Sequence, residues 1–163
     1  MAAYRFIRWL DDVTLADVPI VGGKNASSGE MVRELRSKGI NVPGGFATTA
    51  EAYRFFLAES GLSNRLKSIL DDLDTRDVSG LHRRGHEIRQ AILSAPLPAR
   101  LAREIGQAYA ELGRKQSAAT VDVAVRSSAT AEDLPDASFA GQQETFLNVQ
   151  GEQALLDACR RCF

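Results

Sequence analysis

The clearest structural signal in the sequence lies between residues 121 and 149. This stretch opens with Val-Asp-Val-Ala-Val-Arg at Val121–Arg126 and closes with Thr-Phe-Leu-Asn-Val at Thr145–Val149. Valines at every second position are typical of a half-buried strand, and the closing run predicts a second strand. The connection between them is long, polar and punctuated by Pro135 and Gly141. The sequence therefore predicts a hairpin whose loop is of the kind that carries function.

Outward from this hairpin, the rest of the chain alternates between short strands and helices. Residues 62–113 show apolar residues at almost exclusively helical spacing. Strands are expected over Tyr4–Leu10 and Phe46–Thr48, and a helix over about residues 26–38 lies between them. These elements predict an α/β fold, with α+β as the alternative, and a helical insertion at about residues 62–113.

Two local patterns refine this prediction. Met31, Val32 and Leu35 are expected to form the buried face of the helix over residues 26–38. Thr49 is a plausible N-cap for a following helix that ends at Gly61.

Composition restricts the class of protein. The 163 residues are 44% hydrophobic and 25% charged, which suits one folded domain. Twenty Lys and Arg oppose 21 Asp and Glu, so no global positive field favours nucleic acid. The amino terminus lacks a signal-peptide pattern and no later run reaches the length of a membrane span. We expect a cytoplasmic domain without nucleic-acid or membrane partners.

The two cysteines, Cys159 and Cys162, have the C-x-x-C spacing of redox and zinc sites. No second Cys or His pair lies nearby in the sequence, and Cys159 shares helical spacing with Leu155, Leu156 and Phe163. This periodicity favours a buried stripe over a redox or metal site.

The first candidate for chemistry is a helix entry with the sequence Gly-Gly-Lys-Asn at Gly22–Asn25. Glycines allow backbone N–H groups to approach phosphate oxygens, a helix start favours anions, and Lys24 adds a mobile positive charge. The segment does not match the Walker A pattern. A structural turn with a solvated lysine is the alternative.

The second candidate is Arg126 with the loop that follows it. An arginine at the end of a valine-rich strand needs a carboxylate, an anionic ligand or solvent. The loop is rich in Ser, Thr and Ala, and residues of this kind can lie against phosphates and donate main-chain N–H groups. An ion pair between Arg126 and Glu132 or Asp133 is an equally good interpretation on physical grounds.

Three segments resemble the phosphoenolpyruvate synthases, a family within the pyruvate, phosphate dikinase group. They are Gly22–Ser27, Val42–Ala50 and Val125–Val149, and the resemblance extends over essentially the whole chain. Ser28 departs from it, because the family usually has a leucine there.

The resemblance implies a partial ATP-grasp-like nucleotide domain with ATP and Mg²⁺ as cofactors. Lys24 and Arg126 would contact ATP phosphates. A segment that covers them would comprise Gly141, Gln142, Gln143, Glu144 and Thr145. In the family, the β-phosphoryl group passes to a histidine on a swivelling domain and then, in a barrel domain, to pyruvate. The overall reaction converts pyruvate, ATP and water to phosphoenolpyruvate, AMP and phosphate in gluconeogenesis.

The phosphohistidine, the barrel and most metal-binding carboxylates are expected beyond Phe163, where the helical pattern stops without a cap. The chain is therefore expected to be a truncated, inactive part of a homo-oligomeric phosphotransferase that meets pyruvate through other domains. Glu144 is the one nearby acid that could reach a phosphate-bound magnesium. His82 and His86 lie among charged residues, a pattern that favours a solvated helix face.

Related functions stay open at this point. A related dikinase or a rifampicin phosphotransferase would share this type of ATP domain. A non-catalytic nucleotide-binding module is the alternative from a different class.

Overall fold

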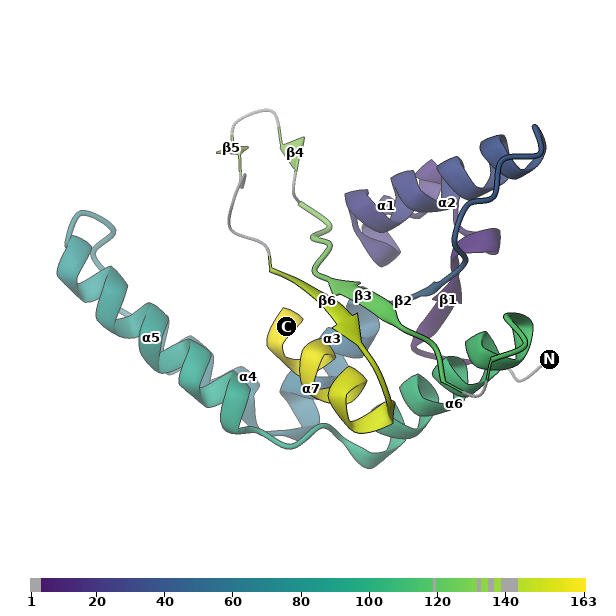
Figure 1. The fold of residues 1–163 in the computed structure, drawn as a ribbon. Helices are drawn as coiled ribbons and strands as arrows, with labels where there is room; N and C mark the ends of the chain where they lie inside the picture. The colour runs from purple at the N-terminus through teal and green to yellow at the C-terminus, as the bar shows by residue number, and fades with distance from the viewer. Residues whose placement is uncertain (1–3, 119, 132, 135–136, 139–143) are drawn as a thin grey trace.

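A computed structural model describes residues 4–163 except 119, 132, 135–136 and 139–143. The chain forms a body of helices and short strands from which α4 and α5 project (Figure 1). The strands are β1 (Ile7–Trp9), β2 (Phe46–Thr48), β3 (Val123–Arg126), β4 (Asp133–Leu134), β5 (Ala137–Ser138) and β6 (Thr145–Val149). The α-helices are α1 (Val18–Val21), α2 (Gly23–Arg36), α3 (Ala50–Glu59), α4 (Leu62–Leu70), α5 (Val78–Ser94), α6 (Ala99–Lys115) and α7 (Glu152–Cys162). Two 3₁₀ turns, Leu10–Asp12 and Leu15–Asp17, join β1 to α1.

The strands form two-stranded antiparallel sheets, β1 with β2, β3 with β6, and β4 with β5. The predicted hairpin is confirmed, because β3 pairs with β6 and Arg126 lies opposite Thr145. The α/β assignment is wrong, since every pairing among the described residues is antiparallel. An α/β protein is built on a parallel sheet covered on both faces, whereas the sheets described here are two-stranded and antiparallel. The domain is mostly helical with small sheets, as the α+β alternative expected.

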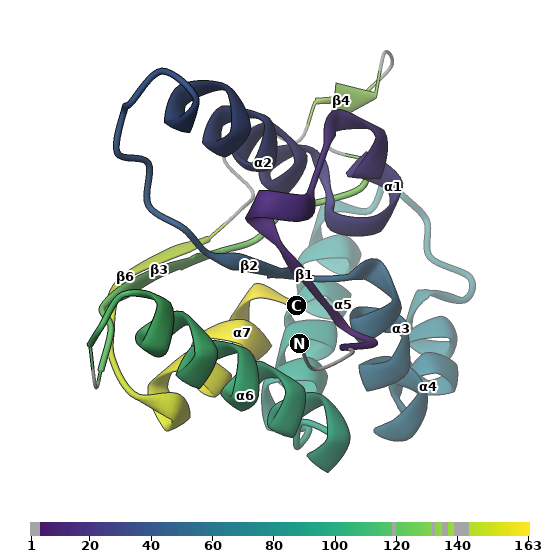
Figure 2. The same ribbon diagram turned by 90° about the vertical axis from the view of Figure 1, so that its right-hand side faces the viewer.

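The main core forms where α6 and α7 pack against β1 and α3. Phe6, Phe56, Leu101 and Ile105 are fully buried there. Figure 2 shows α6 running across the front of this body, with α7 behind it. Burial of large apolar side chains contributes about 1.5–3 kcal/mol each. This core holds the ends of the β3–β6 hairpin, because the Tyr109 hydroxyl donates to the Val121 carbonyl at 2.6 Å and accepts from the Gly151 N–H at 2.9 Å.

The helical character expected for residues 62–113 is confirmed by α4, α5 and α6. The three helices play different parts. The arm made by α4 and α5 extends from the body, whereas α6 supplies Leu101, Ile105 and Leu112 to the main core (Figure 1). That residues 62–113 are an insertion stays a prediction.

Local patterns were confirmed in two places and wrong in one. Thr49 caps α3, and its side chain accepts from the Ala52 N–H at 3.2 Å. Leu155 and Cys159 are buried on α7, as the stripe predicted. Met31 is 49% exposed, because α2 packs through Ala26, Gly29 and Val32. Gly29 lies so close to Val13 that a Cβ would be 2.4 Å from its carbonyl oxygen, and this approach sets the buried face.

In the described part of the chain, no helix has the length and apolar content that crossing a bilayer requires.

Candidate functional site

The two segments singled out in the sequence meet in the structure. The entry to α2 packs against the residues that follow β3. The Gly23 N–H donates to the Ala129 carbonyl at 3.1 Å, and the Asn25 N–H donates to the Ser128 hydroxyl at 3.2 Å. Segments about a hundred residues apart therefore form one junction, which we call the α2–β3 junction and define as Gly22–Asn25 and Ser28 with Arg126–Ala129.

Gly22 makes this close approach possible. Its φ is +82°, a left-handed conformation that side chains rarely adopt. A Cβ at this position would lie 2.3 Å from the Ser128 hydroxyl and 2.6 Å from its backbone. The junction thus requires glycine for both backbone conformation and space.

The backbone N–H groups at the start of α2 are used differently from the prediction made from the sequence. Backbone N–H groups at the start of α2 were expected to face phosphate oxygens. Two of them, on Gly23 and Asn25, are instead used by the β3 loop. Anion recognition at this junction must therefore come mainly from side chains.

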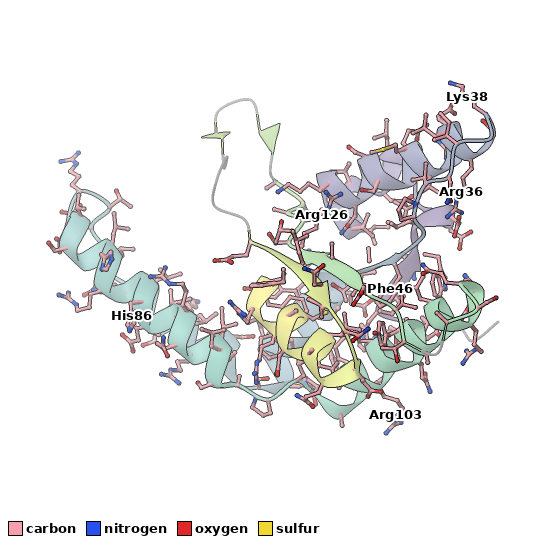
Figure 3. The ribbon with its side chains drawn as sticks, in the orientation of Figure 1. Arg36, Lys38, Phe46, His86, Arg103 and Arg126 are labelled. Atoms are coloured by element: carbon pink, nitrogen blue, oxygen red, sulfur yellow. The ribbon has the colours of Figure 1, made fainter. Side chains whose placement is uncertain are left out.

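Arg126 lies at the end of β3 and faces α2 (Figure 3). Its Nη2 donates to the Ser28 hydroxyl at 2.6 Å and approaches the Lys24 carbonyl at 3.4 Å. Among the residues that the structure describes, no carboxylate forms a salt bridge with Arg126. The side chains of Glu132 and Asp133, the ion-pair alternative, lie outside the described residues. The positive charge of Arg126 is thus held by neutral acceptors.

A cavity of about 710 Å³ opens beside the junction. Arg126, Ser127, Ser128 and Thr130 line its polar side. The apolar part of its wall includes Ile92 and aromatic side chains, namely Tyr53, Phe146 and Phe163. A space of this size with an apolar wall and a few converging polar groups is typical of a small-molecule site.

The charges around the cavity are strongly biased. Four arginines line it, and Glu144 is the one acidic residue among the described lining residues; the arginines are Arg89, Arg126, Arg160 and Arg161. Arg160 pairs with Asp157, and the Arg161 guanidinium lies 4.1 Å from the centre of the Phe146 ring. Among the described residues, the buried Ser127 hydroxyl has no hydrogen-bond partner. This balance of charge favours an anionic ligand.

Burial favours the neutral forms of Tyr53 and Cys162 in the wall and of Cys159 nearby. Burial raises the pKa of the Tyr53 hydroxyl. Burial, assisted by the Glu144 carboxylate, raises the pKa of Cys162 to about 11, and burial raises the pKa of Cys159 to about 12. Thiols in this state are poor nucleophiles and poor metal ligands at neutral pH. The buried interpretation of the C-x-x-C pair is therefore supported.

The predicted site residues are distributed as follows. Lys24 and Arg126 are neighbours, because the Arg126 guanidinium reaches the Lys24 backbone. Glu144 lines the cavity, and its carbonyl accepts from the Ser127 N–H at 3.2 Å. Thr145 is exposed and pairs with Arg126 across the hairpin. Gly141, Gln142 and Gln143 lie outside the described residues.

Two contacts of the junction were not expected from the sequence. Ser28 stood out only as a departure from a resemblance, and nothing in its neighbourhood signalled a contact with Arg126. Ser128 was part of a loop expected to donate main-chain N–H groups, whereas its side chain accepts one. The glycine at position 22 could have indicated the contact of Ser128 with α2, because a glycine allows close approach of another segment.

The histidines take no part in this site. His82 and His86 are exposed on α5, and His86 lies on the projecting arm away from Arg126 (Figure 3). Nor do the described residues include a cluster of three or more His, Cys, Asp or Glu side chains that could hold a metal ion.

Comparison with known proteins identifies relatives along almost the whole chain. Residues 18–163 match the family described as pyruvate phosphate dikinase, AMP/ATP-binding domain. The chain is 54% identical to a phosphoenolpyruvate synthase of Neisseria meningitidis over 99% of its length, and 53% and 50% identical to those of Synechocystis sp. and Escherichia coli over 96%. It spans about 20% of the length of each of these relatives.

Proposed function

Because the chain belongs to the pyruvate phosphate dikinase AMP/ATP-binding domain family, we propose that it is the ATP-binding part of a phosphoenolpyruvate synthase. In this proposal the ATP phosphates bind at the α2–β3 junction, between the side chains of Lys24 and Arg126. The segment from Gly141 to Thr145 covers them. The domain is a partial ATP-grasp-like fold, closed by chain that lies outside these 163 residues.

One observation carries the phosphate assignment. The Arg126 guanidinium lies at the cavity wall, next to the backbone of Lys24, without a carboxylate partner among the described residues. Arg126 is exposed and an arginine is always ionised, so its guanidinium is open to an anion from solution. Phosphate oxygens match its planar set of donors. ATP, a ligand named in the description of the family, supplies such phosphate oxygens and their negative charge.

Magnesium fits this arrangement through Glu144. The carboxylate belongs to the same cavity wall as Arg126. Magnesium is commonly held by one or two carboxylates together with substrate phosphates. Glu144 would supply one oxygen ligand, and the metal would neutralise part of the phosphate charge.

The proposed reaction of the longer protein is the conversion of pyruvate, ATP and water to phosphoenolpyruvate, AMP and phosphate. The residues of this chain would bind and orient ATP, and Arg126 would stabilise charge on the transferring phosphoryl group. The phosphohistidine and the pyruvate site would belong to other domains. The isolated chain should therefore bind nucleotide without turnover and without phosphorylation of His82 or His86.

Calorimetric titration of the chain with MgATP tests the binding site. Arg126→Ala and Lys24→Ala should each weaken binding about tenfold or more, because hydrogen bonds to ionised groups are the strong ones. Arg103→Ala is the matched control, since Arg103 is exposed on α6, away from the cavity. Equal affinities for Arg126→Ala, Arg103→Ala and the unmodified chain would refute the phosphate site.

A further inference from the structure

Ser28 lies on α2 within hydrogen-bond distance of the Arg126 guanidinium. We infer that Ser28 is a positioning residue that holds the Arg126 guanidinium against α2 without neutralising it. This inference rests on the proposed function, in which Arg126 binds ATP phosphates. It adds a residue to that site which neither the resemblance nor the family match assigns.

The geometry forms a directional chain of hydrogen bonds. The Ser28 hydroxyl donates to the Lys24 carbonyl at 2.8 Å, one helical turn earlier on α2. Its single proton is thereby used, so its oxygen is left to accept from the Arg126 Nη2 at 2.6 Å. Hydrogen bonds in series polarise one another, and a cationic donor strengthens the bond further.

This chain ties Arg126 to the same helix turn that carries Lys24. The start of α2 is itself fixed to the β3 loop by the Gly23 and Asn25 N–H groups. The Arg126 guanidinium and the Lys24 backbone are therefore held as one unit before ligand arrives. Ordering a long side chain costs up to about 2 kcal/mol, and a side chain that is already ordered avoids most of that cost on binding.

The acceptor is neutral, and this determines what the contact can do. A carboxylate at position 28 would also hold the guanidinium, but it would cancel the charge that attracts phosphate. A hydroxyl fixes direction and leaves the charge in place. Among the described residues, Nη2 is the Arg126 atom that meets acceptors, and no described residue takes up Nε or Nη1, which in our proposal donate to the ligand.

Three substitutions of Ser28 separate position from charge. Ser28→Thr keeps the hydroxyl and should bind MgATP within about twofold of the unmodified chain. Ser28→Ala removes the acceptor and should weaken binding about fivefold. Ser28→Asp restores an acceptor but pairs with the charge, and should weaken binding about tenfold or more. Ser27→Ala is the matched control, since Ser27 immediately precedes Ser28 on α2 and its side chain is exposed.

Two measurements make the test independent of overall stability. The first is NMR of the Arg126 guanidinium in the chain without ligand, where hydrogen bonding slows rotation about the bonds to Cζ. Ser28→Ala should speed this rotation, whereas Ser28→Thr and Ser27→Ala should not. The second is MgATP affinity in an Arg126→Ala background, where Ser28→Ala should have no further effect because its target is gone.

The outcomes separate this inference from the proposed function. If Arg126→Ala weakens MgATP binding but Ser28→Ala changes neither affinity nor guanidinium rotation, the positioning role is wrong and the phosphate site stands. If Ser28→Ala changes rotation while Arg126→Ala leaves MgATP affinity unchanged, the contact exists and the phosphate site is wrong. An equal loss for Ser28→Ala with and without Arg126 would also overturn the inference, since it would show a general effect on α2.

Discussion

The α6 face and the α2–β3 junction hold the chain together by different means. On α6, Leu101 and Ile105 are fully buried in the main core, where many apolar contacts support one another. At the junction, the Asn25 N–H donates to the Ser128 hydroxyl and the Arg126 guanidinium donates to the Ser28 hydroxyl. The first region provides stability that tolerates small adjustments. The second provides a defined geometry around a positive charge and contributes little apolar burial.

The difference teaches where to look for function in this domain. Leu101 and Ile105 on α6 are buried and apolar, so they provide no group that could bind a charged ligand. Within the described part of the chain, the junction leaves the charge of Arg126 without a carboxylate and the Ser127 hydroxyl without a hydrogen-bond partner. Incomplete pairing beside a cavity is typical of a binding site.

The largest effect is expected at Arg126 itself. In a full-length phosphoenolpyruvate synthase that carries this chain, Arg126→Ala should lower turnover by about a hundredfold to a thousandfold, because such contacts act on transition-state charge. Arg126→Lys should rescue little, since a compact ammonium cannot reproduce the planar set of donors of a guanidinium. Steady-state kinetics of both variants, with Arg103→Ala as control, measure this. Near-normal turnover of Arg126→Ala would show that the junction does not contribute to phosphoryl transfer through Arg126.

The core should respond in the opposite way. Leu101→Ala should lower the free energy of unfolding by about 3 kcal/mol, because it leaves a cavity in a fully buried site. The MgATP affinity of the folded protein should stay unchanged. Urea unfolding and calorimetry report the two quantities, and Leu147→Ala, at a side chain that is 68% exposed, is the control. A large affinity loss in Leu101→Ala at full folding would show that the two regions are not separate.

Gly22 belongs to the junction, and its substitution should affect both stability and binding. Gly22→Ala should lower stability by about 2–3 kcal/mol through backbone strain and contact with Ser128, and should also weaken MgATP binding. Gly39→Ala provides the comparison, because Gly39 also has a positive φ, +77°, but nothing lies within 4 Å of the added Cβ. The difference between the two variants isolates the close approach to Ser128. Equal losses of stability and of affinity would show that the contact is unimportant.

The smallest effect concerns pH and the two cysteines. Burial raises the pKa of Cys159 to about 12 and of Cys162 to about 11, from an ordinary value of 9.0. The unfolded chain therefore releases these protons at lower pH than the folded one, and stability should fall as pH rises above about 9. Thermal unfolding between pH 8 and 10.5 should show a smaller fall in Cys159→Ala than in the unmodified chain. Rapid alkylation of Cys159 at pH 7 in the folded chain would contradict this environment.

Local patterns in the sequence were enough for most elements. Alternating valines predicted β3, and apolar spacing predicted the helices between Leu62 and Lys115. These succeeded because period and capping act within a few residues. The face of α2 was misjudged, since Met31 is exposed while Gly29 is buried. A buried glycine marks close backbone contact, which hydrophobic spacing does not record.

The sequence alone also indicated Lys24 and Arg126 as candidates, because glycines before a helix and an arginine after a strand are local features. Only the tertiary structure shows that Lys24 and Arg126 are neighbours. It brings them together through the pairing of β3 with β6 and the packing of Ser128 on Gly22. The contact between Ser28 and Arg126 is of the same kind. Contacts across about a hundred residues depend on how whole elements pack, and a hydroxyl has no preferred partner until packing brings one within 3 Å.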